Sequence, residues 1–130
     1  MPARSGRRAS ANTPSSSFPR PYDMANPHAR SDRAIVARAT RIAADTYKVF
    51  RPQILQPTRG GLAISTARQV AQYLAHCSGQ VPLNRLAKLF HRDITTIMHN
   101  VALIEDWRDA PEFDELMATL EARFNAEALV

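Results

Sequence analysis

Residues 83–104, LNRLAKLFHRDITTIMHNVALI, constrain the fold of this 130-residue chain more than any other stretch. Apolar residues recur at helical spacing within residues 83–90 and again within residues 97–104, so each half should form a helix with one buried stripe. A polar tripeptide at residues 91–93 separates the two halves. This pattern predicts a helix-turn-helix whose second helix begins at Ile94. The stripes expected to be buried are Leu83, Leu86, Ala87 and Phe90, then Ile97, Val101 and Ile104.

The first turn of the second helix should present Ile94, Thr95 and His99 outward, flanked by Arg92 and Asp93. A small tip of polar and methyl-bearing side chains on a rigid helix suits the major groove of DNA. Asp93 has two interpretations that the sequence leaves open. Its carboxylate can cap the helix by accepting a backbone N–H, or it can accept from the amino group of a cytosine.

Basic side chains near this motif are candidates for contacts with DNA phosphates, although each could equally be ordinary surface charge. They are Arg68, Arg85, Lys88 and Arg92. The charge distribution favours the first interpretation. Residues 33–104 hold ten Lys or Arg against two acids, for +8, whereas residues 105–130 hold two Arg against eight acids, for −6. A polyanion would therefore be attracted to the middle of the chain.

The remaining sequence predicts an all-α fold, a small helical bundle around the helix-turn-helix. Residues 1–31 are rich in Arg, Ser and Pro and should form a disordered basic arm, with a mitochondrial transit peptide as the second interpretation. Residues 32–126 should form one helical domain. One further expected helix is capped by Ser31 or Asp32 and runs to about Val49, and a short helix has Pro52 at its first position and continues over residues 53–55. Another runs from Thr66 to about Cys77. The last helix starts at Pro111 and has the apolar stripe Phe113, Leu116, Met117, Leu120 and Phe124.

Two local signals place the ends of the helix predicted over residues 66–77. Thr66 and Gln69 match a capping box, in which each side chain would satisfy a backbone N–H of the first turn. Gly79 is expected to stop the helix. Before this helix, Gly60 and Gly61 indicate a loop.

Composition and motifs also exclude several functions. The single cysteine, Cys77, rules out an intramolecular disulfide and fits a reducing cytoplasm. No apolar run is long enough for a membrane span, and the four histidines lack metal-ligand spacing. There is no phosphate-binding loop for a nucleotide and no arrangement typical of a nucleophilic triad. We expect no enzyme activity, cofactor, metal or nucleotide.

From about residue 35 to 124 the chain resembles the C-terminal DNA-binding domain of DnaA, the bacterial chromosomal replication initiator. The resemblance rests on residues 68–71, Arg-Gln-Val-Ala, on residues 86–90, Leu-Ala-Lys-Leu-Phe, and above all on residues 92–99. The last segment is similar to the family's Arg-Asp-His-Thr-Thr motif, two aliphatic residues and His. This resemblance implies a module that binds double-stranded DnaA boxes. It also implies that Asp93, Thr95 and Thr96 face bases, while Arg68 and His99 help to hold the DNA backbone.

The chain departs from the family pattern in four ways. Ile94 replaces the motif's His, which changes the expected base preference. Thr66 stands where the family commonly has an Arg that enters the minor groove, and Arg59 is the nearest substitute. The loop over residues 56–63 is less basic, and there is no ATPase module, so we expect no ATP-driven origin opening by this chain.

The leading hypothesis is sequence-specific binding of double-stranded DNA in the bacterial cytoplasm, in association with the nucleoid. The protein would be a small transcriptional regulator or a modulator of replication initiation at DnaA-box-like sites. The expected contact residues are Arg59, Arg68, Lys88, Arg92, Asp93, Ile94, Thr95, Thr96 and His99. One alternative is a protein-interaction module that has lost DNA binding and contacts a partner through its acidic last helix. Another is non-specific DNA coating driven by the basic arm.

Overall fold

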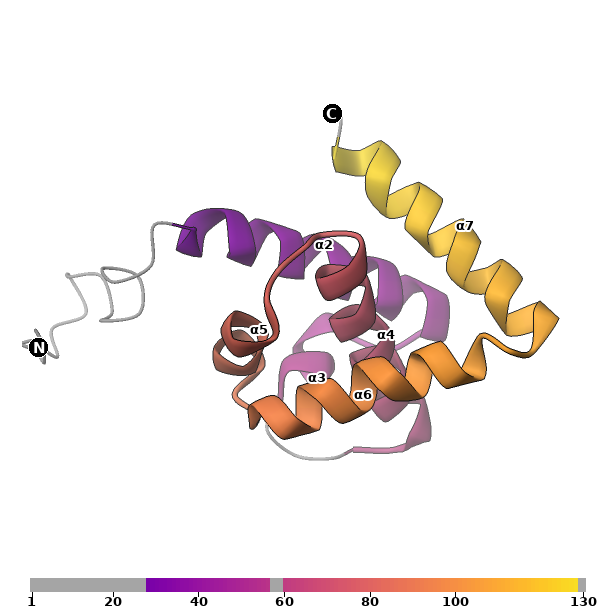
Figure 1. Cartoon of the computed structure of the whole chain (residues 1–130), viewed down its shortest axis with the longest axis horizontal. Helices are drawn as coiled ribbons and strands as arrows, with labels where there is room; N and C mark the ends of the chain where they lie inside the picture. Colours follow the sequence, from indigo (N-terminus) through magenta and orange to yellow (C-terminus); the bar gives the residue numbers. More distant parts are fainter. Residues whose placement is uncertain (1–27, 57–59, 129–130) are drawn as a thin grey trace, which may run out of the picture. The chain divides into compact units, whose positions relative to one another are not determined.

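Stretches with apolar residues at helical spacing form all the regular structure in the described part of this protein. The computed structural model describes residues 28–56 and 60–128. Within them every regular element is a helix, which confirms the all-α prediction. The helices, shown in Figure 1, are α2 (Ala29–Tyr47), α3 (Arg51–Leu55), α4 (Leu62–Cys77), α5 (Leu83–Phe90), α6 (Ile94–Trp107) and α7 (Pro111–Ala128).

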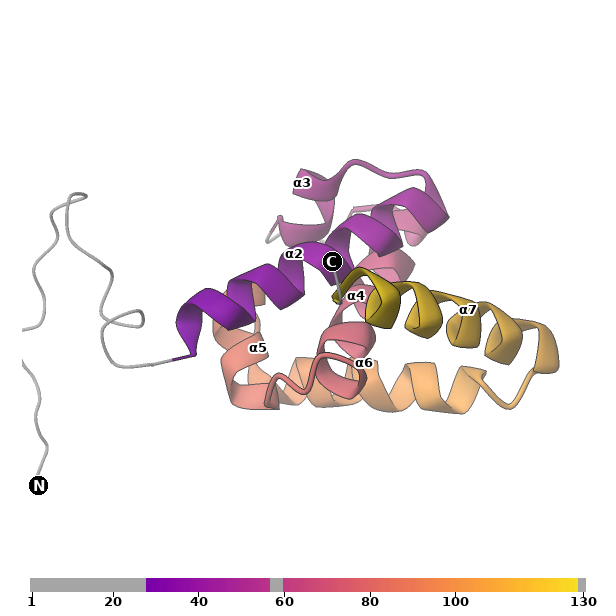
Figure 2. The same ribbon diagram turned by 90° about the horizontal axis from the view of Figure 1, so that it is seen from above.

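The helix α4 is the centre of the bundle. Half of its 16 residues are buried, including the six consecutive residues 70–75, so the helix is covered on every side. It contacts α3, α5, α6 and α7. In Figure 2, α4 lies between α2 and α3 on one side and α6 on the other. The orientation of α6 is therefore set mainly by its packing on α4.

The helix-turn-helix prediction is confirmed in its helix bounds and in its buried stripes. α5 ends at Phe90 and α6 begins at Ile94, and Leu86, Phe90, Ile97 and Ile104 are all buried. The remaining stripe residues pack against the same core. Between the helices the chain reverses through His91, whose φ is 56°, and the Arg92 N–H donates to the Ala87 carbonyl at 3.0 Å.

The predicted capping box at Thr66 is wrong. α4 begins four residues earlier, with Gly61 as its N-cap, and the Ser65 N–H already donates to the Gly61 carbonyl at 3.0 Å. Thr66 therefore lies inside the helix. The Gln69 amide, which was expected to close the box, instead donates from Nε2 to Asn100 Oδ1 on α6 at 3.4 Å. The short pattern of residues 66–69 could not reveal this partner, which lies 31 residues away.

The predicted cap of α2 is also wrong, because the helix begins at Ala29 and places Asp32 in its first turn. The Asp32 side chain is almost fully buried and accepts from Arg85 Nε at 2.7 Å. This ion pair links α2 to α5. α3 begins at Arg51, one residue before Pro52, its predicted first position.

Gly79 follows α4, which ends at Cys77 as predicted, but the glycine is needed for a different reason. The left-handed angle in this turn belongs to Gln80, whose φ is 61°. A Cβ on Gly79 would lie 2.3 Å from Ile35 Cγ2 and 2.7 Å from the Ala75 carbonyl oxygen. The glycine therefore provides room for α2 to approach the end of α4.

The chain divides into two units after Ser31, and the apolar core belongs to the second unit, Asp32–Val130. Of the first unit the structure describes residues 28–31, where α2 begins. The predicted disordered arm otherwise falls outside the described residues. None of the helices in the described part has both the length and the apolar character needed to cross a membrane.

Candidate nucleic-acid interface

The first turns of α6 present one exposed face to solvent and one buried face to α4. Thr95 and His99 are exposed, as the sequence predicts, and Thr96 is exposed as well. Ile94 is 42% exposed, so its side chain does not pack into the turn as an apolar residue usually would. Hydroxyl, imidazole and methyl groups thus share a surface that could donate to bases and contact the methyl group of thymine.

Met98 belongs to the same surface and was missed by the sequence analysis. It follows Ile94 by four residues and is 50% exposed. Helical spacing of i and i+4 could have identified it, because residues four apart lie on the same face. A flexible thioether beside Ile94 enlarges the apolar part of the tip.

Asp93 occupies the N-cap position of α6 without the predicted capping interaction. Its backbone is extended, with φ −66° and ψ 149°, and its carbonyl accepts from the Thr96 N–H at 3.0 Å. Among the described residues, its carboxylate makes no cap hydrogen bond. The exposed carboxylate therefore keeps its acceptor capacity.

Arg68 lies inside the protein rather than on the outward face of the motif. The residue is 6% exposed, and its guanidinium donates from Nε to the Ile54 carbonyl at 2.7 Å and from Nη2 to the Gln53 carbonyl at 3.0 Å. Burial, and secondarily the charge of Arg92, lowers the pKa of this guanidinium below its usual range. Arg68 thereby fastens the end of α3 to α4.

Arg92 ties the turn of the helix-turn-helix to the same end of α3. Its Nη2 donates to the Gln56 carbonyl at 3.1 Å, and this carbonyl also accepts from Arg68 at 3.4 Å. The chain leaves Gln56 into residues 57–59, so Arg59 lies outside the described residues. The two arginines thus share the Gln56 carbonyl at the end of α3.

The other basic candidates are placed differently from one another. Lys88 is exposed in the last turn of α5, close in sequence to the tip of α6. The Arg85 guanidinium is paired with the buried Asp32 carboxylate. Lys88 is exposed and Arg92 is half-buried, so both are better placed than the buried Arg68 to reach a phosphate.

Asn100 is a buried polar residue on α6 that the sequence analysis did not identify. Its Nδ2 donates to Gln72 Oε1 at 2.7 Å, and its Oδ1 accepts from Gln69 Nε2. Both glutamines are on α4. Because hydrogen bonds are directional, this amide cluster fixes the rotation of α6 about its axis and so decides which residues face outward.

A scan against protein-family models found no match, and a search of curated proteins found no relative. Within residues 28–56 and 60–128, no group of three or more His, Cys, Asp or Glu side chains is placed to hold a metal ion.

Proposed function

We propose that this protein binds double-stranded DNA in a sequence-specific manner, with the first turns of α6 in the major groove. The observation that carries the proposal is the exposed tip of Asp93, Ile94, Thr95, Thr96 and His99 on a helix whose opposite face is held by α4. A helix that recognises DNA needs a rigid support of this kind. Recognition of the sequence depends on the placement of a few side chains against the edges of the bases.

The resemblance of residues 92–99 to the DnaA motif supports a more specific proposal. The protein is a DnaA-like module that acts at DnaA-box-like sites, as a transcriptional regulator or as a modulator of replication initiation. Its partner is duplex DNA in the nucleoid. The net charge of +8 on residues 33–104 favours this partner, since phosphates dominate the attraction between proteins and DNA.

The basic residues have two roles in this proposal. Lys88 and Arg92 contact phosphates beside the groove. Arg68 acts as a positioning residue, since its guanidinium is occupied by the carbonyls of α3. Lys88→Ala should lower the salt slope of binding by about one unit without changing base preference. A slope equal to that of the parent protein would remove Lys88 from the interface.

Salt-titrated binding to two duplexes of equal length, one with a DnaA box and one of random sequence, tests the proposed function. We expect a preference for the box of about 10³ or more, which is typical of specific binders. Equal affinity with a steep salt slope would instead indicate non-specific coating. Deletion of residues 1–27 separates these cases, because coating by the basic arm should then largely disappear.

Asp93→Asn tests the proposed reader directly. The amide adds a donor where the carboxylate only accepts, so selection from random DNA should show a changed base preference at one position. Asn is also a preferred N-cap residue, so we expect the variant to remain folded. An unchanged preference would show that Asp93 does not contact a base.

The acidic last helix favours a second candidate function, a protein-interaction module. The first turn of α7 carries Glu112 and Asp114, and residues 105–130 have a net charge of −6. A partner captured equally well before and after nuclease treatment, together with no DNA binding at low salt, would support this function over the first.

A further inference from the structure

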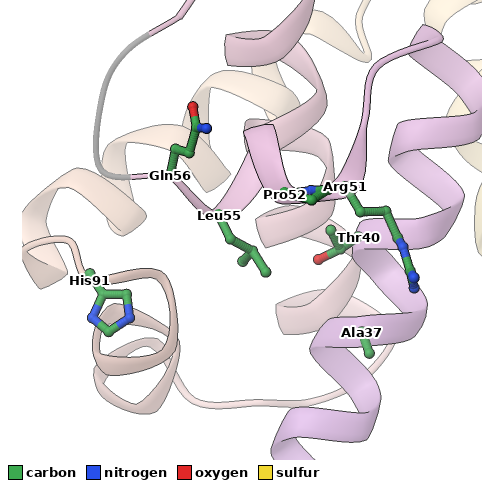
Figure 3. Close-up of a pocket in the computed structure, with 7 residues that line it drawn as sticks. All are labelled: Ala37, Thr40, Arg51, Pro52, Leu55, Gln56 and His91. Carbon is green, nitrogen blue, oxygen red and sulfur yellow. The ribbon is translucent and has the colours of Figure 1, made fainter.

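A pocket of about 670 Å³ lies beside the helix-turn-helix, away from the outward face of α6. Its walls come from α2, from α3 and from the turn between α5 and α6. Figure 3 shows Ala37 and Thr40 of α2 and Leu55 of α3 around a common space, with His91 across from them. Arg51 and Gln56 complete the rim. None of these residues belongs to the proposed DNA-contacting tip.

The pocket is a surface hollow open to solvent, and its size and lining would suit one side of a small organic molecule. Sites for such molecules span roughly 300–1,000 Å³ and combine an apolar wall with a few polar groups. Here Ala37, Pro52 and Leu55 supply the apolar wall. Leu55 is 38% exposed although its neighbour Ile54 is fully buried. A leucine held half in solvent at a concave surface is a natural contact for an apolar ligand group.

The charges around the pocket favour an anion. All the lining residues come from the segment 33–104, which holds only two acids. One of them, Asp45, is paired with Arg123 at 2.9 Å, and the other is Asp93 on the α6 tip. Arg51 therefore supplies a positive charge at the rim that no lining carboxylate offsets. Residues 1–27 carry four Arg against one Asp, so the chain's own arm has the wrong charge to occupy this pocket.

We propose that this pocket binds a small amphipathic carboxylate. The apolar body of the ligand packs on Ala37, Pro52 and Leu55. Its carboxylate lies toward the rim, where the Arg51 guanidinium can donate hydrogen bonds, while His91 lies at the opposite end of the pocket.

A ligand in this pocket should also affect DNA binding, because it would contact residues that are linked to the start of α6. This step rests on the proposed function. Gln56 and His91 line the pocket, and Arg92, the residue after His91, donates to the Gln56 carbonyl. A ligand that contacts both residues therefore touches each end of the link between α3 and the turn that starts α6. Binding of ligand and of DNA should then be coupled, and each should change the affinity for the other by the same factor.

Fluorescence titration of the full chain with 8-anilinonaphthalene-1-sulfonate, an apolar aromatic anion, tests the site without DNA. We expect saturable 1:1 binding and displacement of the dye by octanoate. Leu55→Asp should weaken dye binding at least tenfold. The matched control Leu62→Asp changes a leucine that is 83% exposed on α4 and outside the pocket, and it should leave dye binding unchanged. Arg51→Gln keeps the apolar wall and should weaken octanoate more than neutral octanol.

Equal dye binding by the parent, Leu55→Asp and Leu62→Asp proteins would overturn the proposal, as would dye that octanoate cannot displace. No saturable binding at all would overturn it as well. Circular dichroism of each variant identifies loss of fold, and Arg51→Gln provides the test if Leu55→Asp unfolds.

Octanoate that binds as expected but leaves DNA affinity unchanged would support the site and overturn only the coupling. Absence of DNA binding by the parent protein would overturn the proposed function, whereas the dye result would still support the pocket.

Discussion

Three residues other than glycine have left-handed backbone angles in the described part of the chain, and each follows a helix. Lys48 comes directly after α2, Gln80 lies three residues beyond α4, and His91 comes directly after α5. This conformation costs a residue with a Cβ roughly 1–2 kcal/mol. At His91 the cost is offset by the hydrogen bonds that close the turn, including the Arg92 N–H to the Ala87 carbonyl.

We expect His91→Gly to raise the free energy of unfolding by about 0.5–1 kcal/mol. Glycine adopts φ near 56° without strain, although its greater freedom in the unfolded chain offsets part of the gain. Urea denaturation measures the change. The control Ala102→Gly, at an exposed position within α6, should lower the free energy of unfolding by about 1 kcal/mol. A less stable His91→Gly protein would mean that the imidazole contributes more than the backbone strain costs.

We expect Gly79→Ala to lower the free energy of unfolding by about 1–3 kcal/mol. The new methyl group would overlap Ile35 and the Ala75 carbonyl, and overpacking of this kind forces α2 and α4 apart. Gly61→Ala is the matched control, because a Cβ there meets nothing within 4 Å and the backbone is extended. Thermal denaturation of both proteins checks the prediction, and equal melting temperatures would contradict it.

Helices in this protein are joined by polar side chains as well as by apolar contact. Arg68 holds the end of α3 on α4, and Asn100 holds α6 on α4 through Gln69 and Gln72. Buried polar groups of this kind are costly when left unpaired, so they favour one arrangement of the helices over alternatives. Apolar stripes alone would allow α6 to rotate or slide with little loss.

We expect Asn100→Ala to lower the free energy of unfolding by roughly 2 kcal/mol, because it leaves the buried Gln72 Oε1 without its donor. Asn125→Ala on the exposed surface of α7 is the control and should change it by less than about 0.5 kcal/mol. Chemical denaturation provides both values. A cost at Asn100 no larger than at Asn125 would show that the amide cluster does not hold α6.

Arg108, the residue after α6, links the end of this helix to α7 and to α4. Its guanidinium contacts Asp114 at 2.6 Å and Glu121 at 2.9 Å on α7, and it donates to the Tyr73 hydroxyl on α4 at 3.2 Å. Two further pairs, Arg41–Glu127 and Arg123–Asp45, join α2 to α7. Part of the negative charge of residues 105–130 is thus used within the fold.

We expect stability to fall between about pH 10 and pH 12 through Tyr73. Burial raises the pKa of this phenol to about 12, despite the opposing hydrogen bond from Arg108. The folded chain holds the proton more tightly, so the contribution is complete below the unfolded pKa of about 10 and is lost as the pH rises through the folded value. The free energy of unfolding should fall by up to about 1.4 kcal/mol per pH unit in this range.

Denaturation of the parent and Tyr73→Phe proteins from pH 8 to 12 isolates this contribution, since other groups also titrate there. The decline should be shallower in Tyr73→Phe, whatever its stability at pH 8. Parallel declines in the two proteins would show that Tyr73 stays protonated or does not contribute.

The candidate site was predictable to the extent that it depends on local spacing. Helical periodicity placed α5, α6 and the exposed residues Ile94, Thr95 and His99, because residues three and four apart share a face of a helix. It did not reveal that Arg68 is buried against α3 or that the Asp93 carboxylate makes no cap bond. Both depend on where another segment lies in space.

The amino-acid sequence by itself determined that this protein is helical, where its helix-turn-helix begins and turns, and which apolar stripes form the core. These properties follow from interactions within a few residues. Only the tertiary structure decided the partners of Asp32, Gln69 and Asn100, the steric need for Gly79, and the pocket beside His91. Each of these joins segments far apart in the chain, and such pairings depend on how whole helices pack.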